Sequence, residues 1–329
     1  MSALIEGYDA ALFDLDGVIY LGPQAVPGAV AALSALRAHR TTVMFVTNNA
    51  ARPAQVVIDQ LTELGIAADD ASVLTSAQVA ASALAAEWPR GTKALVSGST
   101  NLAGLLGEAG FQIVEDADDH PAIVVQGYDP DLSWRRLDEA TLAIQAGARW
   151  YATNSDASRP TDRGLVPGVG GAIAVIATAL GQSPEVFGKP HLPMLREAIS
   201  RTGARRPIFV GDRLDTDISG AQRAGIDSLL VLSGAHGKFD LASSNEVHPT
   251  YIGRDVGALL LPPRIAEHTP DGIRCGEQFA TATDGRLQLV GDHRDIDSQL
   301  DALWAALQLV WADPRIDARA ALESLELLP

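Results

Sequence analysis

Two aspartates near the start of the chain have the spacing needed to do chemistry together. Asp14 and Asp16 are two residues apart and follow the apolar run 8–13, which we predict to be a buried strand. Gly17 lets the chain turn away sharply at the end of that strand. Both carboxylates would then project into the crevice where open parallel sheets bind ligands. Such a pair suits a divalent cation combined with a carboxylate nucleophile.

The spacing alone proves little, because the same Asp-x-Asp pattern recurs along the chain. It is found at Asp116/Asp118, Asp129/Asp131, Asp215/Asp217 and Asp295/Asp297. Most of these pairs are typical of solvated turns or helix starts. The chemical assignment must therefore come from the context of the first pair.

That context is a set of polar motifs, each placed at the carboxyl end of a predicted strand. They are Thr47-Asn48, Lys189, and Gly211-Asp212 with Asp217. In a doubly wound sheet these strand ends converge on one crevice, so distance in sequence is no obstacle. The motifs supply a hydroxyl, main-chain N–H groups, a fixed cation and further carboxylates. Phosphoryl transfer requires this combination, with Mg²⁺ as the divalent cation.

The elements that would position these residues alternate between strands and helices. Residues 1–84 show a βαβαβα pattern, typical of a parallel sheet wound with helices. A second α/β set occupies residues 85–183, and residues 184–253 return to the first sheet. We therefore predict an α/β fold with a doubly wound parallel-sheet core and an inserted α/β cap. We predict that residues 254–329 form a small α+β extension. It would contain a hairpin around 283–285 and a helix over 296–311 with a stripe of apolar residues along one face.

The composition of the chain limits its possible binding partners and its cellular compartment. The chain has 329 residues, 47% hydrophobic, with a net charge of −16 and no basic cluster, so we expect no nucleic-acid partner. Cys275 is the single cysteine, which excludes an intrachain disulfide and fits a reducing compartment. The first ten residues lack the basic and apolar regions of a secretion signal, and no apolar stretch is long enough to span a bilayer. We expect a cytoplasmic protein without a membrane partner; a homo-oligomer stays open.

The ordered motifs resemble those of the haloacid dehalogenase superfamily of aspartate-nucleophile phosphatases. Within it, the chain is similar over residues 5–253 to the branch with a large α/β cap between the second and third motifs. That branch includes NagD-like, p-nitrophenyl-phosphate, phosphoglycolate, glycerol-phosphate and pyridoxal-phosphate phosphatases. The motifs that carry the resemblance are Asp14-Leu-Asp-Gly-Val, Val46-Thr-Asn-Asn, Pro167-Gly168, Gly188-Lys189-Pro190 and Gly211-Asp-Arg-Leu-Asp-Thr-Asp. Ala50 departs from the pattern, because many relatives have Ser there.

The resemblance implies a role for each matching residue. Asp14 would be the nucleophile and Asp16 the general acid/base. Mg²⁺ would be bound by Asp14, by the main-chain carbonyl of Asp16 and by Asp212, with Asp217 supporting that set from behind. Thr47, Asn48 and Lys189 would hold the phosphoryl group.

The cap would then select the substrate, a small phosphorylated metabolite. The family's specificity loop corresponds to residues 153–160, in which Asn154, Asp156 and Arg159 are the candidate residues. The loop shows no aromatic cage, which favours a small aliphatic phosphate over pyridoxal 5'-phosphate. Glycerol 3-phosphate is the leading expectation and 2-phosphoglycolate the next. A receiver-like signalling module that holds an aspartyl phosphate is the alternative of another class, but it needs neither Asp16 as acid/base nor a cap.

Overall fold

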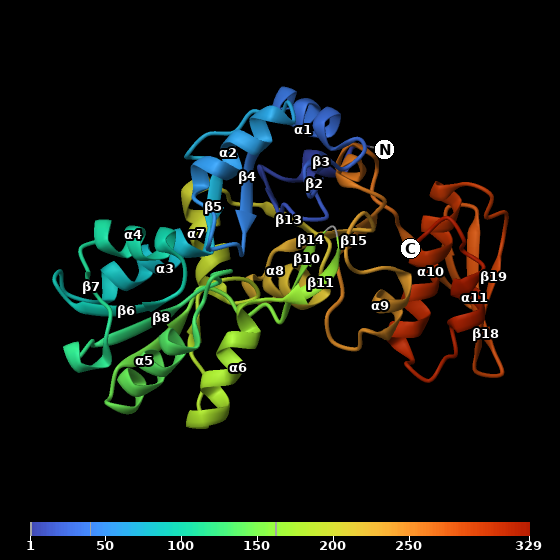
Figure 1. Ribbon diagram of the computed structural model, residues 1–329. Coiled ribbons are helices and arrows are strands. Elements are labelled where there is room, and N and C mark those ends of the chain that lie inside the picture. The colour runs from blue at the N-terminus through green and yellow to red at the C-terminus, as the bar shows by residue number, and fades with distance from the viewer. Residues whose placement is uncertain (1, 40, 162) are drawn as a thin grey trace. The chain divides into compact units, whose positions relative to one another are not determined.

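The largest sheet of the protein has six strands, in the order β15-β14-β13-β1-β4-β5 (Figure 1). The structure is a computed structural model and describes residues 2–39, 41–161 and 163–329. The six strands are Ala10–Phe13 (β1), Thr42–Thr47 (β4), Val73–Thr75 (β5), Pro207–Gly211 (β13), Asp227–Val231 (β14) and Tyr251–Gly253 (β15). The sheet is parallel, and β1 pairs with β13 from Ala10 opposite Pro207 to Phe13 opposite Val210. The predicted doubly wound α/β core is thus confirmed.

The strands of this sheet are short apolar runs, which suits a sheet whose two faces are both covered by helices. Every residue of β1 and of β13 is buried, as is typical of parallel strands between helical layers. Helices alternate with the strands along the chain. They are Ala29–Ala38 (α1), Ala54–Glu63 (α2), Ser76–Glu87 (α3), Leu192–Thr202 (α7), Ser219–Ala224 (α8) and Lys238–Ser243 (α9).

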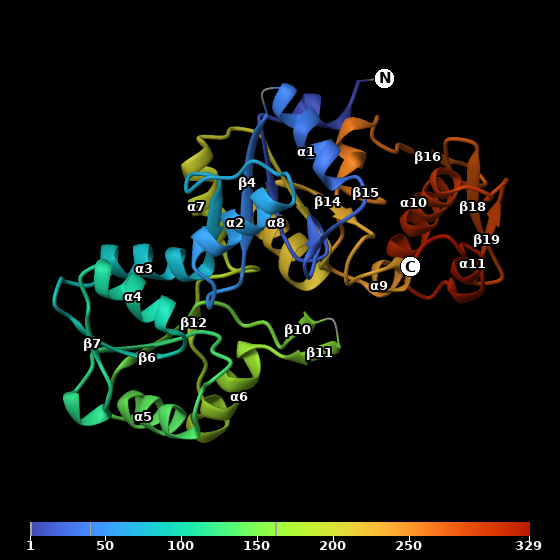
Figure 2. The ribbon, with the colours of Figure 1, turned by 45° about the horizontal axis from the view of Figure 1, so that its top comes forward.

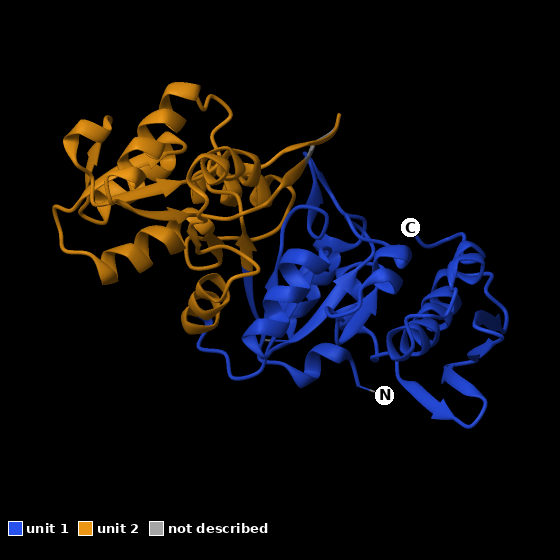
Figure 3. Ribbon diagram, turned by 90° about the horizontal axis from the view of Figure 1, so that it is seen from below, with its two compact units in different colours: residues 1–44, 202–329 blue, residues 45–201 orange. Residues whose placement is uncertain are grey.

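Contacts within the chain divide it into two compact units, residues 1–44 with 202–329 and residues 45–201 (Figure 3). The boundaries predicted from sequence at 84/85, 183/184 and 253/254 are defined differently and stay a prediction. Short elements complete the core regions: Leu4–Gly7 (η1), Tyr20–Leu21 (β2), Gln24–Ala25 (β3), Leu214–Ile218 (η3, one π-helical turn) and Val256–Leu260 (η4).

A second parallel sheet, confirming the predicted cap, lies within residues 45–201 (Figure 2). Its order is β12-β9-β8-β6-β7, from strands Lys93–Ser97 (β6), Gln112–Val114 (β7), Ile123–Gln126 (β8), Arg149–Ala152 (β9) and Glu185–Val186 (β12). The accompanying helices are Thr100–Glu108 (α4), Trp134–Gln145 (α5) and Val169–Leu180 (α6), with a short turn at Ala117–Asp119 (η2). Side chains from β6, β8, β9, α5 and α6 form one buried cluster.

The specificity segment is more ordered than the sequence suggested. Where we predicted a loop, Ser158–Thr161 (β10) pairs in antiparallel fashion with Gly164–Pro167 (β11). The prolines and glycines of this stretch hid the hairpin, since they are weak strand formers. Residue 162, between the two strands, lies outside the described residues.

The C-terminal region is an antiparallel sheet with two helices, in agreement with the predicted α+β extension. Its strands are Ala266–Thr269 (β16), Gly272–Cys275 (β17), Gln278–Thr283 (β18) and Arg286–Val290 (β19), and its helices are Ile296–Ala312 (α10) and Arg319–Glu323 (α11). The predicted hairpin joins β18 to β19 through Asp284 and Gly285, whose φ angles of 51° and 73° suit a type I′ turn. Before this hairpin, β17 and β18 are separated at Gly276, where φ is 55°.

The apolar stripe of α10 packs into a core that is shared with the large sheet. This cluster joins Leu303 and Leu307 of α10 to Leu230 of β14 and Ile252 of β15. The extension therefore belongs to the same packed body as the strands that carry the acidic motifs. Among the described residues, the helices are all too short or too polar to cross a bilayer.

Candidate active site

The first predicted carboxylate is fixed directly after β1. The main-chain N–H of Asp14 donates to the carbonyl of Val210 at 2.9 Å, which continues the pairing of β1 with β13 by one residue. The Asp14 side chain is buried, whereas that of Asp16, two residues on, is exposed. Gly17 turns the chain with φ at 85°. The backbone of Asp14 is thus fixed by the sheet and its carboxylate is buried, whereas the Asp16 carboxylate faces solvent.

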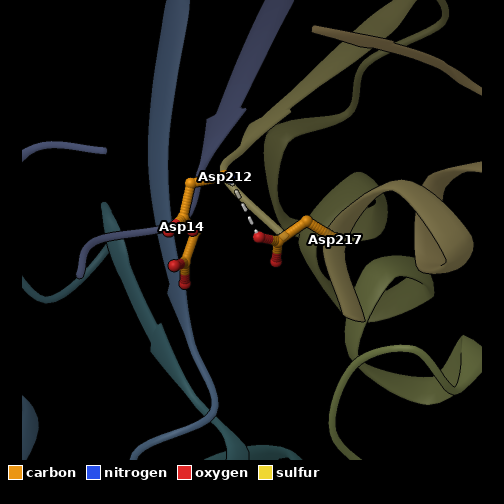
Figure 4. Close-up of side chains that lie close together, drawn as sticks. All are labelled: Asp14, Asp212 and Asp217. Carbon is orange, nitrogen blue, oxygen red and sulfur yellow. Dashed lines mark hydrogen bonds between the residues drawn. The ribbon is translucent and has the colours of Figure 1, made fainter. Parts of the chain in front are cut away.

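Three buried aspartates gather at this strand end (Figure 4). Asp14, Asp212 and Asp217 each offer a carboxylate oxygen, and these oxygens all lie within 4.8 Å of one another. Buried carboxylates at such spacing repel one another and have lost their hydration. A bound cation would offset both costs. Carboxylate oxygens are also the donors that Mg²⁺ prefers. The residues present therefore fit a magnesium ion.

Asp217 supports its neighbours as well as belonging to the cluster. Its Oδ2 accepts the main-chain N–H groups of Asp212 at 3.2 Å and of Arg213 at 3.1 Å. A Cβ added at Gly211 would overlap the Asp217 side chain, so glycine is required for this close approach. The fully buried Asp217 therefore fixes the loop that presents Asp212, and its predicted support of a metal ion stays a prediction.

Asp212 is held from the other side by residues that the sequence did not single out. Its Oδ2 accepts the N–H of Ala235 at 2.6 Å, and its main-chain carbonyl accepts the N–H of His236 at 3.2 Å. Gly234 has no room for a Cβ beside the Asp212 carboxylate. Sequence alone offered one signal here, the Ser-Gly-Ala-His-Gly run just after a predicted strand.

Gly17→Ala should greatly weaken Mg²⁺ binding. The added Cβ would overlap Asp212 Oδ2 and lie 3.0 Å from the Cα of Gly234, so the carboxylate would have to move. Gly22→Ala is the matched control, because Gly22 also has a positive φ, 57°, but a Cβ there meets nothing within 4 Å. Calorimetric titration with Mg²⁺ measures the effect. Equal losses in both variants would mean that backbone strain, and not the crowding of Asp212, is responsible.

A second polar group forms within residues 45–201, around Asn48. Its Nδ2 donates to Asp156 Oδ1 and to the Lys189 carbonyl, both at 3.0 Å, and its Oδ1 accepts the Lys189 N–H at 2.8 Å. Both amide hydrogens are therefore engaged. Thr47 ends β4, is buried, and accepts the N–H of Asn49 on its hydroxyl oxygen at 3.1 Å.

Lys189 is the most deeply buried of the basic residues that we predicted to be functional. Its side chain is 2% exposed, and Nζ donates to the carbonyl of Val46 at 3.3 Å. Gly188 precedes it because a Cβ there would come within 2.6 Å of Asn48 Oδ1 and of the Thr153 carbonyl. Lys189 is thus a buried cation fixed beside Asn48 by its main-chain and side-chain hydrogen bonds.

The three candidate specificity residues lie in different settings. Asn154 is buried and accepts a hydrogen bond from the Thr153 hydroxyl at 3.0 Å. Asp156 contacts Asn48, a pairing across 108 positions that sequence could not reveal. Arg159 is exposed on β10, with its guanidinium carbon 4.7 Å from the ring centroid of Tyr128. Sequence reasoning missed Tyr128, which only the fold places under Arg159.

The structure thus assembles the predicted residues in two groups, each within one compact unit. Asp14, Asp212 and Asp217 form the acidic cluster, while Asn48, Asp156 and Lys189 form the polar group. The side chain of Asp16 is exposed. Its predicted metal contact is the main-chain carbonyl and stays a prediction.

Comparison with known proteins shows which families and relatives the chain resembles. Residues 11–112 match the model of the haloacid dehalogenase-like hydrolases, and residues 186–259 match a second model of HAD-like hydrolases. The chain is 40% identical to a D-glycerol 3-phosphate phosphatase of Mycobacterium tuberculosis, over 98% of this chain and 89% of that protein. It is 33% identical to an acid sugar phosphatase of Staphylococcus epidermidis, over 78% and 98% of the two chains.

Solved structures give the same result. A crystal structure of a glycerol phosphate phosphatase from Mycobacterium tuberculosis in complex with magnesium superposes with a TM-score of 0.87 at 37% identity, covering 98% of this chain and 97% of that one. A 4-nitrophenylphosphatase from Thermotoga maritima gives a TM-score of 0.74 at 29% identity, covering 79% and 98%. The chain therefore belongs to the haloacid dehalogenase-like hydrolases, as a phosphatase of the NagD and p-nitrophenylphosphatase type.

Proposed function

We propose that this phosphatase hydrolyses small aliphatic phosphate monoesters, with glycerol 3-phosphate as its substrate. The similarity to a D-glycerol 3-phosphate phosphatase over 98% of the chain carries the substrate assignment. That similarity reaches beyond the 78% that the acid sugar phosphatase matches. The proposed partner is a small metabolite in the cytoplasm, a reducing compartment that suits a chain with one buried cysteine.

The reaction would proceed in two steps through Asp14. In the first, a carboxylate oxygen of Asp14 attacks phosphorus in line, forming an aspartyl phosphate as the bond to the alkoxide breaks. Asp16 gives its proton to that alkoxide. In the second, Asp16 takes a proton from water, which attacks phosphorus and releases inorganic phosphate and the Asp14 carboxylate. The exposure of Asp16 suits a group that must exchange protons with substrate and water.

The other site residues would hold charge in place. Asp14, Asp212 and the main-chain carbonyl of Asp16 are the proposed Mg²⁺ ligands, with Asp217 fixing the Asp212 loop. When bound, Mg²⁺ supplies neutralisation of negative charge on the transferring phosphoryl group. The Thr47 hydroxyl and the Lys189 ammonium would bind phosphoryl oxygens. Asn48 would contribute its main-chain N–H, because its amide is engaged with Asp156 and Lys189.

Two other phosphate esters are the alternatives to glycerol 3-phosphate as the substrate. Arg159 is exposed, and its guanidinium lies over the ring of Tyr128. This exposed cation could bind the carboxylate of 2-phosphoglycolate. Pyridoxal 5'-phosphate is favoured less, since its ring needs an aromatic enclosure and the hairpin of β10 and β11 carries no aromatic residue. Both remain outcomes of the experiment that follows.

The function is tested by phosphate release from a panel of small esters. The panel contains glycerol 3-phosphate, 2-phosphoglycolate, pyridoxal 5'-phosphate and p-nitrophenyl phosphate, each with Mg²⁺ and with chelator. We expect Mg²⁺-dependent turnover with the highest kcat/KM on glycerol 3-phosphate. A higher kcat/KM on 2-phosphoglycolate would reassign the substrate, and no turnover of any ester would refute the proposal.

Arg159→Ala should change discrimination within the same panel more than it changes p-nitrophenyl phosphate turnover. The side chain lies on the cap hairpin and contacts Tyr128. Its loss should therefore change kcat/KM mainly according to the non-phosphate part of each ester. Arg135→Ala is the control, since Arg135 is an exposed cap arginine paired with Asp116. Equal losses on every ester would assign Arg159 to the phosphate site or to folding.

A further inference from the structure

The segment 233–238, which we term the strap, joins the acidic cluster to the end of the chain. At its first end, the Ser233 hydroxyl donates to the Gly17 carbonyl at 2.8 Å, and the Ala235 N–H donates to Asp212 Oδ2 at 2.6 Å. The ring Nδ1 of His236 accepts the N–H of Leu214 at 2.8 Å, beside the Asp212 loop. The strap is therefore hydrogen-bonded to the turn after Asp14 and to Asp212 itself.

The second end of the strap is fixed by the C-terminal residues 325–329. Lys238 Nζ donates to the carbonyls of Leu325 at 2.7 Å and Leu328 at 2.6 Å. The main-chain N–H of Lys238 donates to Pro329 O at 2.9 Å. A Cβ added at the adjacent Gly237 would come within 2.5 Å of the same oxygen, so strap and C-terminal segment are in close contact.

Lys238 is unusual because its charged end is enclosed. The residue is 6% exposed, and burial lowers the pKa of its amine. Leu325 and Leu328, which supply the accepting carbonyls, belong to the core cluster shared by α10 and the large sheet. A buried amine is tolerated when its hydrogens are satisfied by fixed acceptors. Two main-chain carbonyls in a packed segment are such acceptors, so the position of Lys238 is set by the C-terminal fold.

We propose that Lys238 is a positioning residue for the metal site, through which the C-terminal segment fixes the strap and thereby the Asp212 carboxylate. The proposal rests on the proposed use of Mg²⁺ by the acidic cluster. It gives the C-terminal region a part in the chemistry, although every metal motif lies upstream of it. Hydrogen-bond partners of metal ligands set ligand orientation and affinity in the same way at other sites.

The direct test is Lys238→Met, measured by calorimetric titration with Mg²⁺ in the absence of substrate. Methionine keeps an unbranched chain of similar length but donates no hydrogen bond. We expect the Kd for Mg²⁺ to rise by about tenfold, the lower end of the effect seen when partners of metal ligands are replaced. Lys93→Met is the control, because Lys93 Nζ also donates to a main-chain carbonyl, that of Asp119, but in the cap.

Gly237→Ala tests the same contact from the other side, without removing an amine. Its φ of −113° is open to any residue, so the added methyl acts on Pro329 O and not through backbone strain. Mg²⁺ binding should weaken here too, whereas Gly104→Ala, where a Cβ meets nothing within 4 Å, should bind normally.

The outcomes separate this proposal from the proposed function. A fall in Tm with an unchanged Kd in Lys238→Met and Gly237→Ala would make Lys238 a stabilising residue alone and overturn the inference. If Lys238→Met does not fold, the Kd of Gly237→Ala decides. A wild-type protein that turns over phosphate esters with Mg²⁺ but gives unchanged Kd values in the variants contradicts only the positioning role. A wild-type protein that binds no Mg²⁺ contradicts both proposals.

Discussion

Asp14→Asn is expected to lower phosphate release by several orders of magnitude on every ester, including p-nitrophenyl phosphate. The substitution removes the negative nucleophile and one carboxylate of the acidic cluster while keeping nearly the same shape. Because both steps of the proposed reaction pass through Asp14, a better leaving group should not rescue the variant. Initial rates over the substrate panel, at saturating Mg²⁺, measure the loss.

Asp215→Asn is the matched control for this substitution. Asp215 lies close to the cluster in sequence, but it is exposed and forms an ion pair with Arg213 at 2.8 Å. Its loss should leave turnover within a few-fold of the wild type. Near-native turnover by Asp14→Asn, or a loss in Asp215→Asn of similar size, would refute the assignment of the nucleophile.

Asp16→Asn is expected to produce a defect that depends on the leaving group. An amide cannot give a proton to the departing alkoxide, so glycerol 3-phosphate should lose the most activity. p-Nitrophenyl phosphate, whose leaving group needs no proton, should lose the least in the first step. Mg²⁺ affinity should change little, since the proposed contact of Asp16 is its main-chain carbonyl. A plot of log kcat/KM against leaving-group pKa should therefore steepen.

The second step should also slow in Asp16→Asn, because no base then activates the water. Aspartyl phosphate should accumulate on Asp14 during turnover of p-nitrophenyl phosphate, where mass spectrometry of quenched enzyme would detect it. Asp131→Asn is the control, as an exposed member of another Asp-x-Asp pair. A uniform loss across leaving groups, or phosphate on a residue other than Asp14, would contradict the proposed roles.

The sequence by itself determined the core architecture and the acidic cluster. Short apolar runs that end in Asp14 and Asp212 predict buried parallel strands, and the carboxyl ends of such strands meet at one edge of the sheet. Both residues were therefore expected together, and their carboxylates do lie together with that of Asp217. The stripe over 296–311 likewise predicted α10, because helical periodicity is a local property of the chain.

Only the tertiary structure decided what the polar side chains touch. The Asn48 amide is engaged by Asp156 and Lys189, 108 and 141 positions away, so the phosphate contact proposed for Asn48 is its main-chain N–H. The hairpin of β10 and β11 and the contacts of Lys238 with the C-terminal segment were equally hidden. Local patterns record burial and periodicity, whereas side-chain hydrogen bonds between distant segments depend on how the loops bring the elements together.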